Sequence, residues 1–315
     1  MRKCFVGFDT SNYTTSAAVC TEDGEIVANL KRPLPVKSGE CGLRQSDAVF
    51  AHVKNLPSLT DELGAVLSSG YEIAAVGVSA RPRDAEGSYM PCFLVGVAAA
   101  HSFAAARGVE VSEFSHQNGH VMAAAYSSGE AERLLRDRFL AFHVSGGTTE
   151  ALLVSLSGEG FSVTLVGETL DLNAGQVIDR VGVALGLDFP CGAALEQLAL
   201  EYEGRLPSVK ISVKNGCCNL SGLENMALKL YESEKDKPLV AAFVFDFIRR
   251  TLSEMAKQIM DKYGKMPVLF AGGVMSNKYM REKLCAELDA SFSEPAFSAD
   301  NAAGIALLCR RRYSV

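Results

Sequence analysis

The sequence lacks any apolar run long enough to cross a lipid bilayer. A membrane-spanning helix needs about 18 or more predominantly apolar residues. The longest candidate, Met90 to Ala106, contains His101 and many small residues, so it predicts a buried helix instead. The first residues also lack an apolar signal core followed by a small-residue cleavage site. These absences argue against a membrane protein and predict a cytoplasmic one.

Cysteine spacings typical of metal sites are also missing. The nine cysteines are scattered along the chain, at Cys4, Cys20, Cys41, Cys92, Cys191, Cys217, Cys218, Cys285 and Cys309. Their number is odd and several lie inside apolar runs, which favours a reducing compartment. The adjacent pair Cys217 and Cys218 cannot easily bridge each other or chelate one ion. We therefore expect structural thiols.

The chain has no excess of positive charge. Its formal net charge is −6, which argues against a protein that coats nucleic acid unaided. Any contact with RNA would therefore need a local basic patch. Three candidates are the pairs Lys31-Arg32 and Arg249-Arg250 and the run Arg310-Arg311-Arg312, although each, taken alone, is better explained as a solvated helix end.

Two segments of similar layout predict a duplicated α/β fold. Residues 4–32 alternate a strand, a polar turn, a strand, a Gly turn and a third strand, and residues 138–168 repeat this order. We expect a first domain at 1–130, completed by a C-terminal helix at 300–315, and a second domain at 131–299. A nucleotide-binding cleft is expected between these two domains.

A third pattern narrows the fold further. Residues 267–271 predict an apolar strand, followed by Gly272 and Gly273 and by a helix that Ser276 and Asn277 open. Two hairpin turns followed by strand–Gly-Gly–helix is the layout of the actin/sugar-kinase/Hsp70 (ASKHA) nucleotide fold. In that layout the two turns approach phosphates, and the Gly-Gly loop borders the adenosine.

The turns themselves suit phosphate binding for a physical reason. Glycines let main-chain N–H groups approach a phosphate without obstruction, and short hydroxyl side chains add donors. The turn of the second segment contains Ser145, Gly146, Gly147, Thr148 and Thr149, and Asp9 precedes the turn of the first. One such turn is weak evidence because tight hairpins favour Gly for conformational reasons. Three in this order favour nucleotide binding.

A histidine pair indicates a metal site. His116 and His120 are four residues apart in a predicted helix capped by Ser115, so both rings lie on one face and could bind one ion. A pair of capping or core histidines is the alternative. Asp300, just before the last helix, is the candidate third ligand, although Asp at that place is also a preferred helix cap. Two imidazoles and one carboxylate suit iron or zinc.

The same segment argues against proteolysis. A zinc protease of the HExxH type needs a glutamate directly after the first histidine to activate water. Here positions 117 and 118 are Gln117 and Asn118.

The motifs together resemble the TsaD family, the tRNA adenosine threonylcarbamoyltransferases formerly called O-sialoglycoprotein endopeptidases. HQNGH is similar to the family's HxxGH, VSGGTTEALLVS to its VSGGHT strand, and AGGVMSNKYMR to its GGV-x-N-x-x-LR. The segments GETLDLNAGQVIDRVGVALGLDFPCGAAL, NLSGLEN and SADNAAGIA also resemble family motifs. The matching segments occupy residues 116–120, 144–155, 167–195, 219–225, 271–281 and 298–306.

The resemblance implies a role for each matching position. It implies metal ligation by His116, His120 and Asp300. It implies binding of an ATP- or AMP-type nucleotide, or of an acyl-adenylate, by residues 145–149, Asp179, Gly192 and Asn277, beside Gly272 and Gly273. Asp179 would hold the ribose hydroxyls, whereas without the resemblance it is an exposed helix carboxylate. The implied reaction transfers threonylcarbamoyl from its adenylate to the exocyclic amine of a tRNA adenosine near the anticodon, with help from partner proteins.

Several positions depart from the family pattern. Asn12 and Tyr13 replace an Asp-Glu pair, Thr148 replaces a histidine, Gln176 a glutamate, and Glu224 a lysine. Residues 79–91 replace a short TAGPG segment and carry Arg81, Arg83 and Asp84. Losing one general base or charge partner typically costs about 10²–10⁴-fold in rate. The catalytic residue is therefore left unassigned.

Three functions remain open on the sequence. The first is an acyltransferase of the threonylcarbamoyl type. The second is a paralogue that binds nucleotide and metal without modifying tRNA, as a regulator or partner. The third is a small-molecule kinase of the same superfold, which Asp9 would suit, although paired metal histidines are foreign to such kinases.

Overall fold

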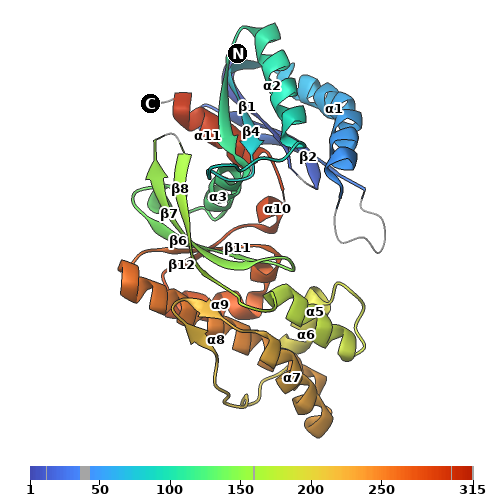
Figure 1. Cartoon of the computed structure of the whole chain (residues 1–315), viewed down its shortest axis with the longest axis vertical. Helices are drawn as coiled ribbons and strands as arrows, with labels where there is room; N and C mark the ends of the chain where they lie inside the picture. Colours follow the sequence, from blue (N-terminus) through green and yellow to red (C-terminus); the bar gives the residue numbers. More distant parts are fainter. Residues whose placement is uncertain (12, 36–42, 159, 299, 314–315) are drawn as a thin grey trace. The chain divides into compact units, whose positions relative to one another are not determined.

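The computed structural model describes residues 1–11, 13–35, 43–158, 160–298 and 300–313, in two compact units. The first unit comprises Met1–Ala131, Leu156–Ser162 and Ala296–Val315, and the second comprises Glu132–Ser155 and Val163–Pro295. The two five-stranded sheets and their helices can be followed in Figure 1. The predicted boundaries of the two functional domains stay a prediction. Among the described helices, none combines the length and apolarity that a bilayer crossing requires.

The first sheet has the strand order β3-β2-β1-β4-β5. Strand β1 pairs antiparallel with β2, so Thr10 lies opposite Thr15 at the turn, and β1 runs parallel to β4. Strands β4 and β5 are also parallel. The bounds are β1 (Arg2–Thr10), β2 (Thr14–Thr21), β3 (Ile26–Pro33), β4 (Tyr71–Arg81) and β5 (Glu110–Ser115).

One face of this sheet carries bulky apolar side chains and the other carries glycines. Val6, Phe8 and Val76 share a buried cluster with residues of α1 (Gln45–Leu67) and α2 (Phe93–Arg107). On the opposite face, a Cβ atom at Gly7 would come within 2.6 Å of the Ala302 carbonyl oxygen. The missing side chain lets α11 (Ala303–Tyr313) lie directly on the sheet, opposite α1 and α2 (Figure 1).

Helix α3 (His116–Ser127) packs against α11 by an equally close approach. A Cβ atom at Gly304 would lie 1.8 Å from the Gly119 carbonyl oxygen, which no real side chain could do. Gly304 therefore sets the spacing of the two helices. The spacing brings the histidine helix beside the start of α11.

The second sheet repeats the strand order of the first. Its order is β12-β11-β6-β7-β8, with β6 antiparallel to β7 and parallel to β11. The bounds are β6 (Phe139–Val144), β7 (Thr149–Ser157), β8 (Gly160–Glu168), β11 (Val268–Ala271) and β12 (Ala290–Phe292). The duplicated strand order predicted from the sequence is present.

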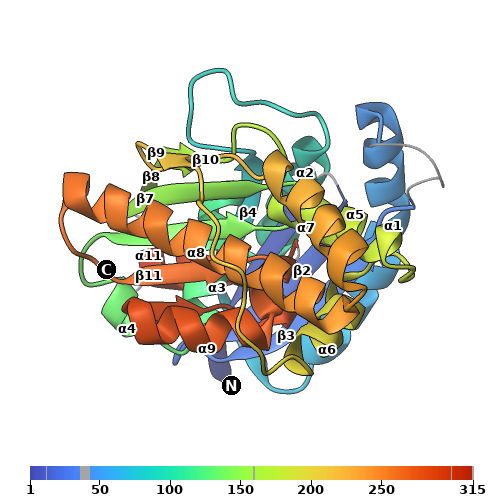
Figure 2. The ribbon, with the colours of Figure 1, turned by 90° about the horizontal axis from the view of Figure 1, so that it is seen from below.

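Helices cover one face of the second sheet, as Figure 2 shows for α8 (Lys237–Tyr263) and α9 (Lys278–Glu287). The Phe142 and Phe270 rings stack with centroids 5.0 Å apart, and they share one buried cluster with Ile248 of α8. The remaining elements are α4 (Ala131–Leu134), α5 (Ala174–Ala184), α6 (Gly192–Leu200), α7 (Ser221–Glu234), α10 (Pro295–Ser298), the 3₁₀ turn η1 (Gly273–Ser276), β9 (Val213–Lys214) and β10 (Cys217–Cys218).

One local prediction needs correction. The stretch 90–106 was expected to form a buried helix, but α2 is buried on one face only: Ala100 is buried, whereas His101 and Leu94 are exposed. The other face is exposed because only one face of α2 meets the sheet. The prediction that Asn277 opens the next helix is confirmed: its carboxamide oxygen accepts a hydrogen bond from the Met280 N–H at 2.9 Å, and α9 begins at Lys278, directly after η1 and Asn277.

Candidate metal and nucleotide sites

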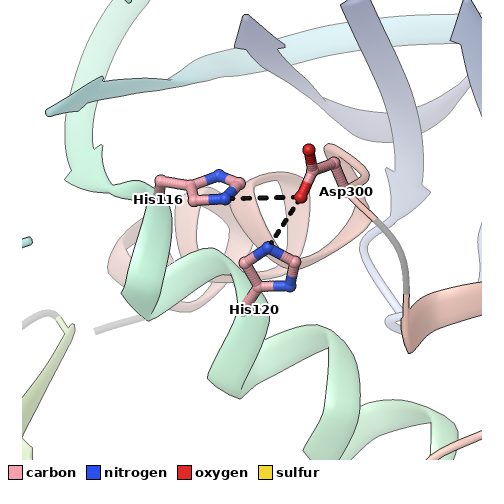
Figure 3. A group of neighbouring side chains, drawn as sticks. All are labelled: His116, His120 and Asp300. Carbon is pink, nitrogen blue, oxygen red and sulfur yellow. Dashed lines mark hydrogen bonds and ion pairs between the residues drawn. The ribbon is translucent and has the colours of Figure 1, made fainter. Parts of the chain in front are cut away.

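The histidine pair stands at the start of α3. The Ser115 hydroxyl accepts a hydrogen bond from the Asn118 main-chain N–H at 3.3 Å, so the predicted cap is present. His116 and His120 are one turn apart, and their ring centroids are 4.3 Å from each other. Both rings point toward the same carboxylate, Asp300, as Figure 3 shows.

Asp300 meets both rings although it lies about 180 residues along the chain from them. Its Oδ1 atom is 3.1 Å from His120 Nε2 and 3.6 Å from His116 Nε2. The alternative helix-capping role falls to Asn301, whose side-chain oxygen accepts a hydrogen bond from the Ala303 N–H at 3.1 Å. All three groups are half-buried members of the first unit.

These donors suit a transition metal. One donor atom from each residue lies within 4.8 Å of the others. Ligands about 2.1 Å from a tetrahedral ion lie roughly 3.4 Å apart, close to the 3.1 and 3.6 Å between Asp300 Oδ1 and the two Nε2 atoms. Two imidazole nitrogens and one carboxylate oxygen match the preferences of iron and zinc, and three protein ligands leave a position open.

A second carboxylate, that of Asp9, contacts the other ring nitrogen of His116. Asp9 is fully buried, and its Oδ2 atom accepts a hydrogen bond from His116 Nδ1–H at 2.7 Å. Burial alone would lower the pKa of His116, but Asp9 and Asp300 outweigh it and raise that pKa to about 10. Burial likewise opposes ionisation of Asp300, yet its hydrogen bonds with the two histidines lower its pKa below the usual range.

The loop at residues 79–91 is tied to the histidine helix. Asp84 accepts hydrogen bonds from the Ser115 hydroxyl at 2.8 Å and from the Asn118 side-chain amide. Arg81 pairs with the same carboxylate at 2.6 Å. Sequence comparison with the family pattern marked this loop as a departure but gave it no role. In the structure its acid helps fix the first turn of α3.

The turn at Ser145–Thr149 belongs to the second unit and is open around its glycines. The Ser145 hydroxyl accepts hydrogen bonds from the main-chain N–H groups of Gly147 and Thr148, at 3.2 and 3.1 Å. A Cβ atom at Gly146 or Gly147 would meet no other atom within 4 Å. The Thr149 hydroxyl is directed inward instead, where it accepts a hydrogen bond from the Ala174 N–H at 2.9 Å.

The start of α5 packs directly against this turn. The Gly175 N–H donates to the Ser145 carbonyl at 3.1 Å, and a Cβ atom at Gly175 would lie 2.7 Å from the Gly146 main chain. Gly175 is thus a supporting residue that sequence reasoning did not single out. Its signal in the sequence is the Ala-Gly pair that opens the helix.

The other predicted nucleotide residues lie on neighbouring elements of the second unit. Asp179 of α5 accepts a hydrogen bond from the Cys191 N–H at 2.8 Å, just before Gly192 opens α6. Gly272 has a φ of +101° and packs against the Val144 carbonyl, while Gly273 has open space around it. Asn277 is buried as a helix cap.

Two further supporting residues were not singled out from the sequence. His52 of α1 is fully buried, and its ring binds the Thr15 hydroxyl and the Ser11 carbonyl, both at 2.8 Å. Asp171 accepts hydrogen bonds at the start of α7, including the Leu220 N–H at 2.7 Å, and these bonds lower its pKa although its partial burial acts in the opposite direction. His52 stands in no recognisable spacing, whereas Asp171 lies in the segment at residues 167–195 that resembles a family motif.

Three of the residues that depart from the family pattern can be placed in the structure. Tyr13 is 45% exposed, and Asn12 lies outside the described residues. The Gln176 side chain accepts the Asn173 N–H at 3.0 Å in a capping box. Glu224 forms an ion pair with Arg180 at 3.1 Å.

One predicted basic patch needs correction. Arg249 is buried on α8 and pairs with Asp246 at 3.0 Å and with Glu287, so it is neither solvated nor exposed to RNA. The physical reason is that α8 is buried on most of its circumference. The Lys31 ammonium group donates to the Ala296 carbonyl at 2.6 Å, and Arg310 donates to the Glu22 carbonyl at 2.6 Å.

Solved structures of other proteins share this fold. Component A of the (R)-2-hydroxyglutaryl-CoA dehydratase of Acidaminococcus fermentans aligns over 99% of each chain, with 13% identity and a TM-score of 0.52. HypF of T. kodakarensis aligns over 99% of this chain and 48% of its own, with 13% identity and a TM-score of 0.56. At these identities the likeness concerns the fold, which is of the predicted ASKHA type.

Sequence relatives are closer. A tRNA N6-adenosine threonylcarbamoyltransferase of Streptococcus pneumoniae is 31% identical over 90% of this chain and 83% of its own length. The enzyme of the same name from Streptococcus suis is 30% identical over 99% of this chain and 93% of its own length. The family pattern "TsaD: tRNA N6-adenosine threonylcarbamoyltransferase" matches residues 38–307. The chain therefore belongs to the TsaD family of tRNA N6-adenosine threonylcarbamoyltransferases.

Proposed function

We propose that this chain transfers a threonylcarbamoyl group from an acyl-adenylate to the exocyclic amine of a tRNA adenosine near the anticodon. The observation that carries the proposal is the convergence of His116, His120 and Asp300 within 4.8 Å, from distant parts of the sequence, in a member of this family. Both imidazoles point at one carboxylate, an arrangement that suits a Lewis-acidic ion.

The reaction itself balances simply. The adenosine amine attacks the carbonyl carbon of the adenylate, the bond from that carbon to the phosphate oxygen breaks, and AMP leaves with the electron pair. The attacking nitrogen gives up one proton. An iron or zinc ion held by His116, His120 and Asp300 would supply Lewis acidity for the developing negative charge.

The second unit would bind the nucleotide part of the donor. The open glycines of the turn at residues 145–149 allow a phosphate to approach the main chain. Asp179 would hold ribose hydroxyls, and Gly192, Gly272, Gly273 and Asn277 would border the nucleoside. An ATP- or AMP-type nucleotide should therefore bind the purified protein.

Recognition of tRNA would be shared with partner proteins of the modification machinery. The chain is acidic overall, and Arg249 is already committed to buried ion pairs. Local cations such as those at residues 310–312 would supply only part of the affinity for RNA.

Rescue of cells depleted of their own threonylcarbamoyltransferase tests this proposal. We expect the chain to restore growth and threonylcarbamoyladenosine in tRNA, and the double variant His116→Ala/His120→Ala to fail although it accumulates to the same level. If the modified nucleoside is absent from cells that contain the folded chain, the transferase function is refuted, whether or not growth recovers.

A second candidate is a paralogue that binds nucleotide and metal without modifying tRNA. The observation that favours it is the exposed Tyr13 in place of a family acid. In that case the purified chain should bind both ligands yet release no AMP from the adenylate in the presence of tRNA and partner proteins.

A further inference from the structure

Asp9 is the most enclosed ionisable group around the histidine helix. Its side chain has no solvent exposure, and its two oxygens accept three hydrogen bonds. The donors are the Ser11 main-chain N–H at 2.9 Å, the Ser79 hydroxyl and His116 Nδ1–H at 2.7 Å. These donors come from three elements: the end of β1, strand β4 and helix α3.

We propose that Asp9 is a positioning residue that decides which ring nitrogen of His116 faces the metal. This inference rests on the metal centre of the proposed function. By holding Nδ1–H, Asp9 makes Nε2 the nitrogen that gives up its proton when an ion binds, and Nε2 is the atom that faces Asp300 at 3.6 Å.

The carboxylate can do this because its own orientation is fixed independently of the metal. Ser11 donates to Oδ1 from the main chain, and Ser79 donates to Oδ2 from the neighbouring strand. The oxygen that meets His116 is therefore held before any ligand binds. A ring fixed at one nitrogen loses little further freedom when its other nitrogen coordinates an ion.

This role differs from the phosphate contact expected for Asp9 from the sequence. A phosphate would bring a second negative charge to a fully buried carboxylate. It could also reach that carboxylate only after the three hydrogen bonds had broken. Contact with the His116 imidazole adds no negative charge and leaves all three hydrogen bonds in place.

Asparagine should not replace Asp9, although its shape is nearly the same. If the amide oxygen still accepts the Ser11 N–H, the amide NH₂ faces His116 Nδ1. The ring must then accept at Nδ1 and carry its proton on Nε2, the nitrogen needed for the metal. If the amide of the Asp9→Asn variant takes the other orientation, its NH₂ group faces the Ser11 N–H, and two hydrogen-bond donors then meet.

Zinc affinity, measured by competition with a chromophoric chelator, tests the role of Asp9. We expect Asp9→Asn to weaken zinc binding about 10- to 100-fold, the usual cost of losing such a partner. Ser16→Ala is the matched control, because the Ser16 hydroxyl donates to the Asp9 main-chain carbonyl at 3.2 Å, is equally buried and does not touch the carboxylate. It should leave zinc affinity unchanged. Equal affinity of Asp9→Asn and wild type would overturn the inference while leaving the metal centre intact.

A measurement on the wild-type protein covers the case in which Asp9→Asn fails to fold. In ¹⁵N spectra of the zinc-loaded protein, His116 should carry its proton on Nδ1 and bind zinc through Nε2. Zinc bound at Nδ1 would overturn the inference. If His116→Ala and His120→Ala leave zinc affinity at the wild-type value, the proposed metal centre itself fails, and the role of Asp9 fails with it.

Discussion

The turn between β1 and β2 is closed by side chains, whereas the turn between β6 and β7 is left open around its glycines. In the first, Asp9 and His52 take up the main-chain groups of Ser11 at 2.9 and 2.8 Å. In the second, Gly146 and Gly147 have no neighbour within 4 Å of a Cβ position. One strand order thus supports two kinds of turn: one fixed by buried side chains in the first unit and one with open space around its glycines in the second.

The largest effect is expected from removing two of the metal ligands, a change that leaves the open turn at residues 145–149 unaltered. The double variant His116→Ala/His120→Ala should lose metal affinity by more than about 100-fold, because it loses two of three ligands. Metal content by elemental analysis and nucleotide affinity by calorimetry check this together. A metal content equal to that of wild type would end the ligand assignment, and a parallel loss of nucleotide affinity would show that the two sites are not separate in function.

The next effect concerns the spacing that brings Asp300 to the histidines. Gly304→Ala should lower the free energy of unfolding by roughly 3 kcal/mol or more, since its Cβ atom would collide with the main chain of α3. Gly222→Ala in α7 is the control, because nothing lies within 4 Å of that Cβ position. Chemical denaturation that showed equal stability for the two variants would contradict the close packing of α3 on α11.

The sequence could predict the repeated strands and the histidine pair because both are short-range patterns. Alternation and turn residues mark the strands, and a spacing of four marks one helix face. Asp300 could be named only as a candidate third ligand, since its distance from His120 depends on how α11 packs. Gly7 and Gly304 make that packing possible, and nothing local marks them as contact points.

The burial of charged residues and the partners they contact could not be predicted from the sequence, because both depend on tertiary packing. Asp9 looked like part of a phosphate loop, yet its closest partner is His116, 107 residues away. Arg249 looked like half of a surface patch, but α8 buries it. A charged residue next to a glycine-rich turn does not reveal whether it faces a ligand or the interior. Only the tertiary contacts settle that.

A smaller effect sharpens the account of the open turn. Gly175→Ala should push the Ser145–Thr149 turn out of place and weaken nucleotide binding roughly 10-fold, about 1.4 kcal/mol. Gly64→Ala in α1, which has open space around it, should leave nucleotide affinity unchanged. Calorimetric titration with an ATP analogue compares the two. Unchanged affinity in Gly175→Ala would mean that the turn does not bind the nucleotide through its main chain.

The smallest effect tests the closed turn through pH. Burial lowers the pKa of His52 below its ordinary value near 6.5, with the Ser11 carbonyl partly opposing. Its neutral ring donates from Nε2 to that carbonyl and accepts the Thr15 hydroxyl at Nδ1. Because the unfolded chain binds the proton more readily, the contribution of His52 is complete above pH 6.5 and is lost as pH falls toward the folded pKa.

His52→Gln should cost about 1–3 kcal/mol at neutral pH, since a fully buried ring and two hydrogen bonds are replaced imperfectly. The gap in unfolding free energy between wild type and variant should then shrink as pH falls below 6.5, because only the wild type gains a proton at residue 52 when unfolding exposes the ring. Urea denaturation at a series of pH values measures that gap. A gap that stays constant or widens toward acid would mean that the turn in the first unit is not closed by a neutral imidazole, and the contrast with the open turn would lose its physical basis.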